Sequence, residues 1–193
     1  MKDITLLIAH PDDEALFMWP ILDRVKRIVC ASDDSCNPAR AWCKERGKCL
    51  EEVGKLIGAD VVHMPLDSEF YRMPTRDEQL KSAAVTIAGH LRGAEIIATH
   101  NSWGEYGHID HLLCHHIART VQAETGCELL VTDIATEINW LPIRPWHQTS
   151  PEWAFTENTL DRPLFDRIKA IYDARGCWTW AWQPTEKCRV YSL

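Results

Sequence analysis

Residues 4–14 decide the fold, and they read Ile4-Thr5-Leu6-Leu7-Ile8-Ala9-His10-Pro11-Asp12-Asp13-Glu14. A continuous apolar run passes directly into a histidine, a proline and three acidic residues, as in a buried strand that delivers polar side chains to its carboxyl end. In an open parallel sheet, ligands bind at that edge. His10 and Asp13 offer a nitrogen and an oxygen donor three residues apart, which suits one metal ion, and Asp12 between them remains available for proton transfer.

Strand and helix patterns alternate from this stretch to about residue 132. The predicted strands are 27–32, 60–65, 95–100 and 128–132, and the predicted helices are 15–25, 39–57, 75–91, 108–123 and 162–174. This alternation predicts an α/β fold with a Rossmann-like, mostly parallel sheet and helices on both faces. Near the end, Trp178, Trp180 and Trp182 alternate as in a strand, which we interpret as part of the core or of a homo-oligomer interface.

Length and composition indicate one domain that spans residues 1–193. With 46% apolar residues, 193 residues can bury one substantial core but are few for two. A net charge of −7 argues against extended nucleic-acid binding, which relies on an excess of Lys and Arg. The first apolar run is far shorter than the roughly 20 residues of a membrane span, and no signal peptide is visible, so we expect a cytoplasmic protein with no membrane span.

The eight cysteines contain no CxxC pair, so their spacing gives little support to a zinc ribbon or a thioredoxin-like site. In a reducing cytosol most of them are expected to be buried thiols. A bridge from Cys43 to Cys36 or to Cys49 stays open.

A zinc ion that activates water needs three protein ligands and one open position. His10 and Asp13 provide two, and a histidine after the fourth predicted strand should provide the third. The candidates are His100, His108, His111, His115 and His116. His111 and His115 have the spacing of a zincin helix, but that motif requires Glu where this chain has Leu112, so the zincin alternative fails.

The two segments together resemble the PIG-L/LmbE family of zinc-dependent N-acetylglucosamine deacetylases. The first segment is residues 9–14, and the second is Gly107-His108-Ile109-Asp110-His111. The resemblance continues in order to Lys169-Ala170-Ile171-Tyr172. It implies an LmbE-like fold, Zn2+ as the cofactor and hydrolysis of an N-acetyl group on a small-molecule acetylated sugar or amine.

The resemblance also implies roles for the residues around the metal. His10, Asp13 and His111 would bind the zinc ion. Asp12 would be the general base that takes a proton from the metal-activated water. Asp12 and Asp13 could alternatively only cap the following helix, because Asp is favoured at that position.

Three further residues match positions that act on the reacting amide. His108 would stabilise the oxyanion or protonate the leaving amine, Tyr106 would stabilise the oxyanion, and Asp110 would orient a histidine. A charged His108 could perform both of its steps, and we expect it to be protonated near neutral pH.

The family pattern is less complete where the substrate would bind. Arg46 and Asp67 fall where members of the family bind sugar, and Trp103 could stack on a sugar ring. Residues 32–35, however, replace a Thr-Asp-Gly-like turn, and Cys49 replaces a common Glu. These departures leave a second substrate class open, a non-sugar N-acyl compound such as a tailoring-pathway amine or a modified nucleobase.

Two other functions fit the sequence less well. A metal-bearing domain that only binds sugar would not need the base and acid positions, which are present. A dinucleotide-binding oxidoreductase is inconsistent with the first strand, because no GxGxxG follows it.

Overall fold

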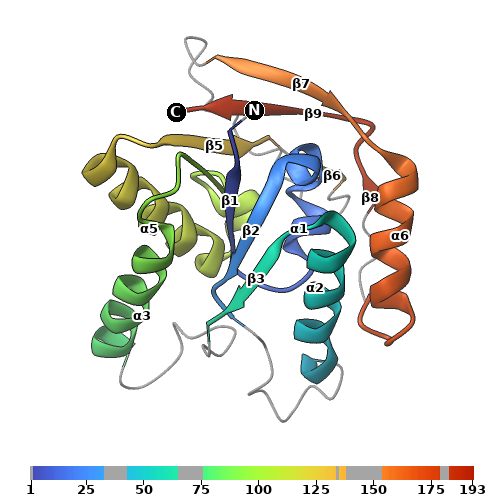
Figure 1. Cartoon of the computed structure of the whole chain (residues 1–193), viewed down its shortest axis with the longest axis horizontal. Coiled ribbons are helices and arrows are strands. Elements are labelled where there is room, and N and C mark those ends of the chain that lie inside the picture. The colour runs from blue at the N-terminus through green and yellow to red at the C-terminus, as the bar shows by residue number, and fades with distance from the viewer. Residues whose placement is uncertain (1, 33–42, 65–75, 134, 138–153, 179–182) are drawn as a thin grey trace.

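The structure is a computed structural model that describes residues 2–32, 43–64, 76–133, 135–137, 154–178 and 183–193. Its centre is a seven-stranded sheet with the strand order β3-β2-β1-β4-β5-β9-β7 (Figure 1). Five strands are parallel, and they are β1 (Ile4–Ile8), β2 (Val25–Cys30), β3 (Asp60–His63), β4 (Ile96–Thr99) and β5 (Glu128–Thr132). The other two are antiparallel, β9 (Lys187–Ser192) against β5 and β7 (Phe155–Thr159) against β9. The predicted mostly parallel sheet is therefore confirmed.

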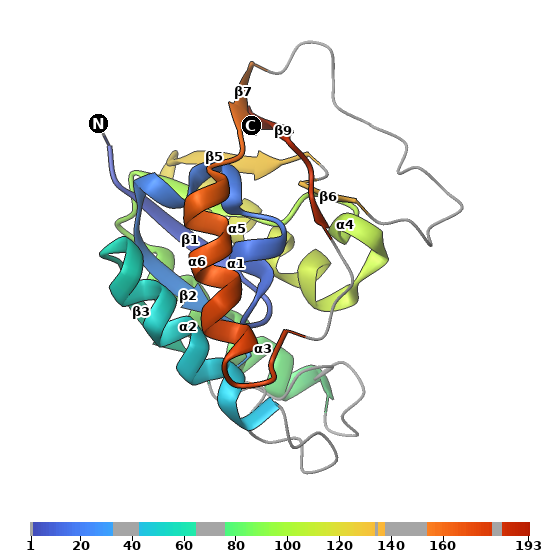
Figure 2. The same ribbon diagram turned by 90° about the vertical axis from the view of Figure 1, so that its right-hand side faces the viewer.

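Helices cover both faces of this sheet (Figures 1 and 2). One face carries α1 (Asp13–Leu16), the 3-10 helix η1 (Trp19–Arg24), α2 (Cys43–Ile57) and α6 (Arg162–Asp173). The other face carries α3 (Arg76–Leu91) and α5 (Ile109–Thr125). Three short elements complete the described chain, namely α4 (Gly104–Gly107) and the two-stranded sheet of β6 (Thr136–Glu137) and β8 (Gln183–Pro184). None of the described helices is both long and apolar enough to cross a membrane.

Strand β1 runs through the middle of the sheet and contributes to two separate cores. Ile4, Leu6 and Ile8 pack into the core that α2 and α6 cover, whereas Leu7 and Ala9 pack into the core that α3 and α5 cover. All five side chains are fully buried. Because both faces are covered, β1 is a continuous apolar run and does not alternate with polar residues.

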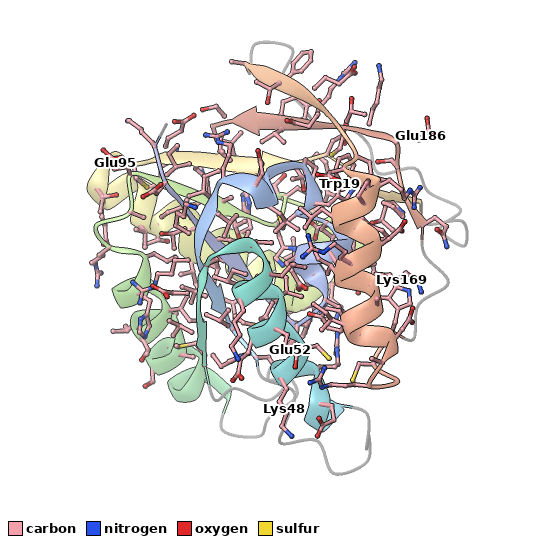
Figure 3. The ribbon with its side chains drawn as sticks, turned by 45° about the vertical axis from the view of Figure 1, so that its right-hand side comes forward. Trp19, Lys48, Glu52, Glu95, Lys169 and Glu186 are labelled. Atoms are coloured by element: carbon pink, nitrogen blue, oxygen red, sulfur yellow. The ribbon has the colours of Figure 1, made fainter. Side chains whose placement is uncertain are left out.

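Helices α2 and α6 lie side by side on their face of the sheet. Figure 3 shows Glu52 on α2 at this boundary, where its carboxylate pairs with Arg175 just beyond α6. Figure 3 also shows Lys169 of α6, whose Nζ lies 5.5 Å from the ring centre of Trp178. Trp178 is half-buried and packs against α6, which agrees with a core role, while Trp180 and Trp182 lie outside the described residues.

The segment after β1 differs from the single interrupted helix predicted over 15–25. Two short elements, α1 and η1, replace it, and Pro20 lies at the start of η1, where a missing backbone N–H is tolerated. Trp19 anchors η1 by donating its Nε1–H to the Ala135 carbonyl over 2.7 Å (Figure 3).

The six cysteines with described side chains are free thiols, and the side chains of Cys36 and Cys43 are outside that part of the structure.

The strand order places a topological switch point at the carboxyl ends of β1 and β4. From β1 the chain proceeds to β2 and β3 on one side, and from β4 it proceeds to β5 on the other. Neighbouring strands with connections that diverge in this way leave space above their carboxyl ends, where ligands bind. Residues 9–14 and 100–111 follow these two strands.

Candidate metal centre and active site

The two segments predicted to meet do meet, beyond the carboxyl ends of β1 and β4. The ring centres of His10 and His108 lie 4.8 Å apart, and those of His10 and His111 lie 5.5 Å apart. Tyr106 lies on the same side, with its ring centre 5.6 Å from that of His111. Two loops about a hundred residues apart in sequence therefore form one buried cluster.

Asp12 adopts a backbone conformation that is rare for residues other than glycine, with φ 106°. Its carbonyl accepts the first bonds of α1, from Ala15 and Leu16 over 3.0 Å each, but its carboxylate caps no N–H of that helix. The carboxylate forms a buried ion pair with Arg46 of α2. The structure therefore argues against the helix-capping alternative for Asp12.

Glu14 stabilises the backbone of Asp12 through a hydrogen bond. It is fully buried, and its carboxylate accepts hydrogen bonds from the Asp12 backbone N–H over 2.9 Å and from the Tyr172 hydroxyl of α6 over 2.7 Å. Burial raises the pKa of Glu14 to about 8, although the bond from Tyr172 acts in the opposite direction. A largely protonated Glu14 near neutral pH avoids a second buried negative charge beside Asp12.

Replacing Tyr172 with Phe is expected to lower the free energy of unfolding by about 1–3 kcal/mol, because the buried Glu14 carboxyl loses a hydrogen-bond donor. Denaturant unfolding of the metal-free protein measures this loss. In a double-mutant cycle with Glu14→Ala, which removes the acceptor altogether, the two effects should be strongly non-additive, since both variants break the same contact. Additive effects would contradict a direct contribution of this bond.

Two overlapping groups of donor atoms could hold a metal ion. His10, His108 and His111 form one, Asp13, His100 and His111 form the other, and the atoms in each lie within 4.8 Å of one another. His111 belongs to both, and the predicted ligands His10 and Asp13 are divided between them. Hydrogen bonds of the individual ring nitrogens distinguish ligands from supporting residues.

His10 and His111 share one arrangement. His10 Nε2 bonds Asp110 Oδ2 over 2.9 Å, and His111 Nδ1 bonds Glu105 Oε2 over 2.6 Å. The opposite nitrogens face Asp13, with His10 Nδ1 3.5 Å from Oδ2 and His111 Nε2 3.5 Å from Oδ1. Among the described residues, His111 Nε2 is buried with no hydrogen-bond partner.

Metal-binding histidines typically anchor one ring nitrogen on a carboxylate and present the other to the ion. Two such histidines beside Asp13 give the nitrogen and oxygen donors that zinc accepts. His10 Nδ1, the Asp13 carboxylate and His111 Nε2 therefore fit a zinc ion.

His100 and His115 have other hydrogen bonds. His100 Nε2 accepts the Ala9 backbone N–H over 3.1 Å, and its Nδ1 bonds Glu105 Oε2 over 3.0 Å. His115 Nδ1 donates to the His100 carbonyl over 2.8 Å. These contacts join the ends of β1 and β4 to α5, which indicates supporting roles for both histidines.

The electrostatics of the cluster favour a cation. Burial alone would lower the pKa of His10, but the hydrogen bonds to Asp110 and Asp13 raise it to about 10. Burial alone would raise the pKa of Glu105, but His100 and His111 lower it to about 2. The carboxylates of Asp110 and Asp13 thus favour a positive charge at His10. A metal ion bound beside Asp13 would supply that charge in place of a second proton on the imidazole.

His108 does not carry the expected charge in this structure. It caps α5, and its Nδ1 accepts the Asp110 backbone N–H over 3.2 Å, so the ring proton is on Nε2. Burial, and next the electrostatic influence of His10 and His111, lower the pKa of His108 to about 4. This structure thus favours a neutral imidazole, which differs from the expected protonated one, and the sequence does not reveal the capping bond that fixes its tautomer; the catalytic role of His108 stays a prediction.

Tyr106 keeps its hydroxyl proton. Burial, and next the charges of Asp13 and Asp12, raise the pKa of Tyr106 well above its usual value. Its ring centre lies 5.7 Å from that of His108. The cluster thus combines two neutral side chains that can donate hydrogen bonds.

Two of the three predicted substrate residues, Arg46 and Trp103, lie in the described part of the structure. Arg46 pairs with Asp12, and Asp67 lies outside the described residues. Trp103 lines a cavity of about 420 Å3 together with Asn101 and His115. Their assignment to substrate binding stays a prediction.

Glu105, which no sequence pattern singled out, is fully buried and bonds two histidines. It lies between predicted elements, in residues 101–107, and has φ 56°. The only local signal is its position between Gly104 and Gly107, which is typical of a tight turn and does not indicate a buried carboxylate.

Comparison with solved structures shows the same fold in several enzymes. The A40926 pseudoaglycone deacetylase Dbv21 has a TM-score of 0.67 and 12% identity, over 100% of this chain and 97% of that chain. A teicoplanin biosynthesis deacetylase in complex with teicoplanin has a TM-score of 0.68 and 11% identity, over 97% of both chains. GalB, the 4-carboxy-2-hydroxymuconate hydratase of Pseudomonas putida KT2440, has a TM-score of 0.55 and 15% identity, over 100% of this chain and 96% of that chain. At these identities, the similarity concerns the fold alone.

Sequence comparison gives the family directly. The model of the PIG-L family, described as GlcNAc-PI de-N-acetylase, matches residues 5–122. This match covers more than half of the chain and includes every residue of the buried cluster from His10 to His111. The protein therefore belongs to the PIG-L family.

Proposed function

We propose that the protein is a zinc-dependent N-deacetylase that hydrolyses the N-acetyl group of an N-acetylglucosamine-type sugar or sugar conjugate. The observation that carries this proposal is the arrangement around Asp13. Two histidines, each anchored on its own carboxylate, present a nitrogen to Asp13. Asp12 lies immediately beside them, and the family membership indicates the same activity.

Three residues of this chain would hold the zinc ion: His10 through Nδ1, Asp13 through its carboxylate and His111 through Nε2. When bound, zinc supplies Lewis-acid chemistry, because it brings the pKa of water towards about 7 and polarises a carbonyl oxygen. The remaining chemistry depends on the side chains around this position.

Asp12 is the general base. Its ion pair with Arg46 favours the ionised carboxylate, which can accept a proton from the attacking water. The Tyr106 hydroxyl and the Nε2–H of neutral His108 are donors that can stabilise the negative oxygen formed from the amide carbonyl. Protonated Asp12 then passes its proton to the leaving nitrogen, and the products are a free amine and acetate.

The test is acetate release from a panel of acetylated compounds. We expect turnover of N-acetylglucosamine or its conjugates in the zinc-loaded protein and little turnover of acetylated amines without a sugar. Enzymatic detection of acetate together with mass analysis of the amine identifies the reaction. Failure to release acetate from any acetamide in the panel would contradict the proposal, which is a necessary test because a hydratase shares this fold.

A second substrate class is a non-sugar N-acyl compound. One observation favours it, namely that Arg46, matched to a sugar-binding position, is buried and paired with Asp12. The same panel distinguishes the two classes, since preferential release from non-sugar acetamides supports the second.

A further inference from the structure

We infer that Glu105 is a positioning residue for the metal site: one oxygen of its carboxylate sets the tautomer and ring orientation of His111, and the same oxygen holds His100 parallel to it. This inference rests on the proposed function only in taking His111 as a zinc ligand. It concerns how the protein prepares that ligand before any substrate binds.

Glu105 is itself held rigidly. It is fully buried, its backbone N–H donates to Asn101 Oδ1 over 3.0 Å, and its Oε1 accepts the Asn101 backbone N–H over 3.1 Å. These reciprocal bonds resemble a capping box, in which two side chains each satisfy the other residue's backbone N–H. They support the positive φ of Glu105, and they leave its second oxygen for the histidines.

The second oxygen, Oε2, bonds the Nδ1 atoms of both imidazoles, at 2.6 Å for His111 and 3.0 Å for His100. The two rings are stacked, with centres 3.9 Å apart and planes 20° apart. A carboxylate oxygen only accepts, so each Nδ1 carries a proton and each ring turns its Nε2 towards Asp13.

The Nε2 atoms of His100 and His111 differ in their hydrogen bonds. That of His100 accepts the Ala9 backbone N–H at the end of β1, next to His10. That of His111 is buried with no hydrogen-bond partner among the described residues and lies 3.5 Å from Asp13 Oδ1. The Glu105 carboxylate thus holds the ends of β1 and β4 together through His100. It also leaves Nε2 of His111 available to bind a metal ion.

Substitution of Glu105 with Gln tests this inference. The side chain keeps its size, but a neutral amide oxygen is a weaker acceptor than a carboxylate oxygen and an amide nitrogen cannot accept at all. The bonds to the imidazole pair are therefore weakened whichever way the amide faces. We expect zinc affinity to fall by about 10- to 100-fold, the usual effect of removing a carboxylate that orients a ligand. Competition with a chromophoric zinc chelator measures the affinity, and the visible spectrum of the Co2+-substituted protein should shift because a ligand changes orientation.

The control is Glu124→Gln on the exposed side of α5, where Glu124 pairs with Arg92. Its zinc affinity and Co2+ spectrum should match those of the unmodified protein. An E105Q protein that folds, binds zinc within about twofold of the control and has an unchanged Co2+ spectrum would overturn the inference. Deacetylase assays play no part in these readouts, so failure of the proposed function would leave them interpretable.

A second measurement needs no variant and so does not depend on how E105Q folds. Long-range 1H–15N spectra of the zinc-loaded protein report which nitrogen of each imidazole carries the proton. We expect His100 and His111 to be protonated on Nδ1, with His108 protonated on Nε2 as an internal comparison. A His111 ring protonated on Nε2, or bound to zinc through Nδ1, would overturn the inference.

Discussion

Asp12→Asn is expected to lower kcat by about 100- to 10,000-fold, the typical contribution of a positioned general base, while the protein keeps its zinc. Asn has the shape of Asp and is among the residues that best tolerate a positive φ, so the turn that begins α1 should survive. The amide cannot accept the proton of the attacking water, and this loss accounts for the lower rate.

Acetate release gives kcat for this variant, and metal analysis of the purified protein gives its zinc content. Asp60→Asn, which alters an exposed side chain at the start of β3, is the matched control and should retain full activity. If D12N lost zinc together with activity, Asp12 would be a metal ligand and the assignment of the base would be wrong.

Removing the metal with a chelator should reduce turnover by at least about 1,000-fold, because several kcal/mol of transition-state stabilisation is lost. Re-addition of zinc should restore turnover, since nitrogen atoms of His10 and His111 lie beside the Asp13 carboxylate. The measurement is kcat/KM before chelation, after chelation and after zinc is returned.

His111→Ala provides the companion variant, because it removes a buried imidazole nitrogen that has no hydrogen-bond partner among the described residues and lies beside Asp13. It should bind zinc weakly and remain inactive at zinc concentrations that restore the unmodified protein. Full turnover in protein shown to contain no metal would rule out the zinc mechanism.

The five parallel strands and the long helices could be predicted because their signals are local. Each parallel strand is a short apolar run, and each helix has its own apolar periodicity and end signals. Strands β7 and β9 were missed for the opposite reason. Residues 155–159 of β7 are mostly exposed and polar, so this strand forms only by pairing with β9, and no local pattern indicates that partner.

The sequence predicts the members of the cluster only where the fold topology alone brings them together. His10, Asp13 and His111 follow strands whose carboxyl ends must share one edge, so their proximity follows from the fold class. The bond that neutralises His108 and the turn that buries Glu105 depend on backbone angles set by tertiary packing. No spacing of residue types in the sequence reports such angles.

Tyr172 belongs to α6, well beyond the last residue matched to the family at position 122. Its hydroxyl nevertheless reaches the carboxyl group that supports the Asp12 turn. A shortened protein that ended with the region matched to the family would therefore lose the Tyr172 hydroxyl, and with it a hydrogen bond that supports the turn carrying Asp12. Engineers who graft this chemistry onto smaller scaffolds would have to carry the aromatic hydroxyl along or supply a substitute for it.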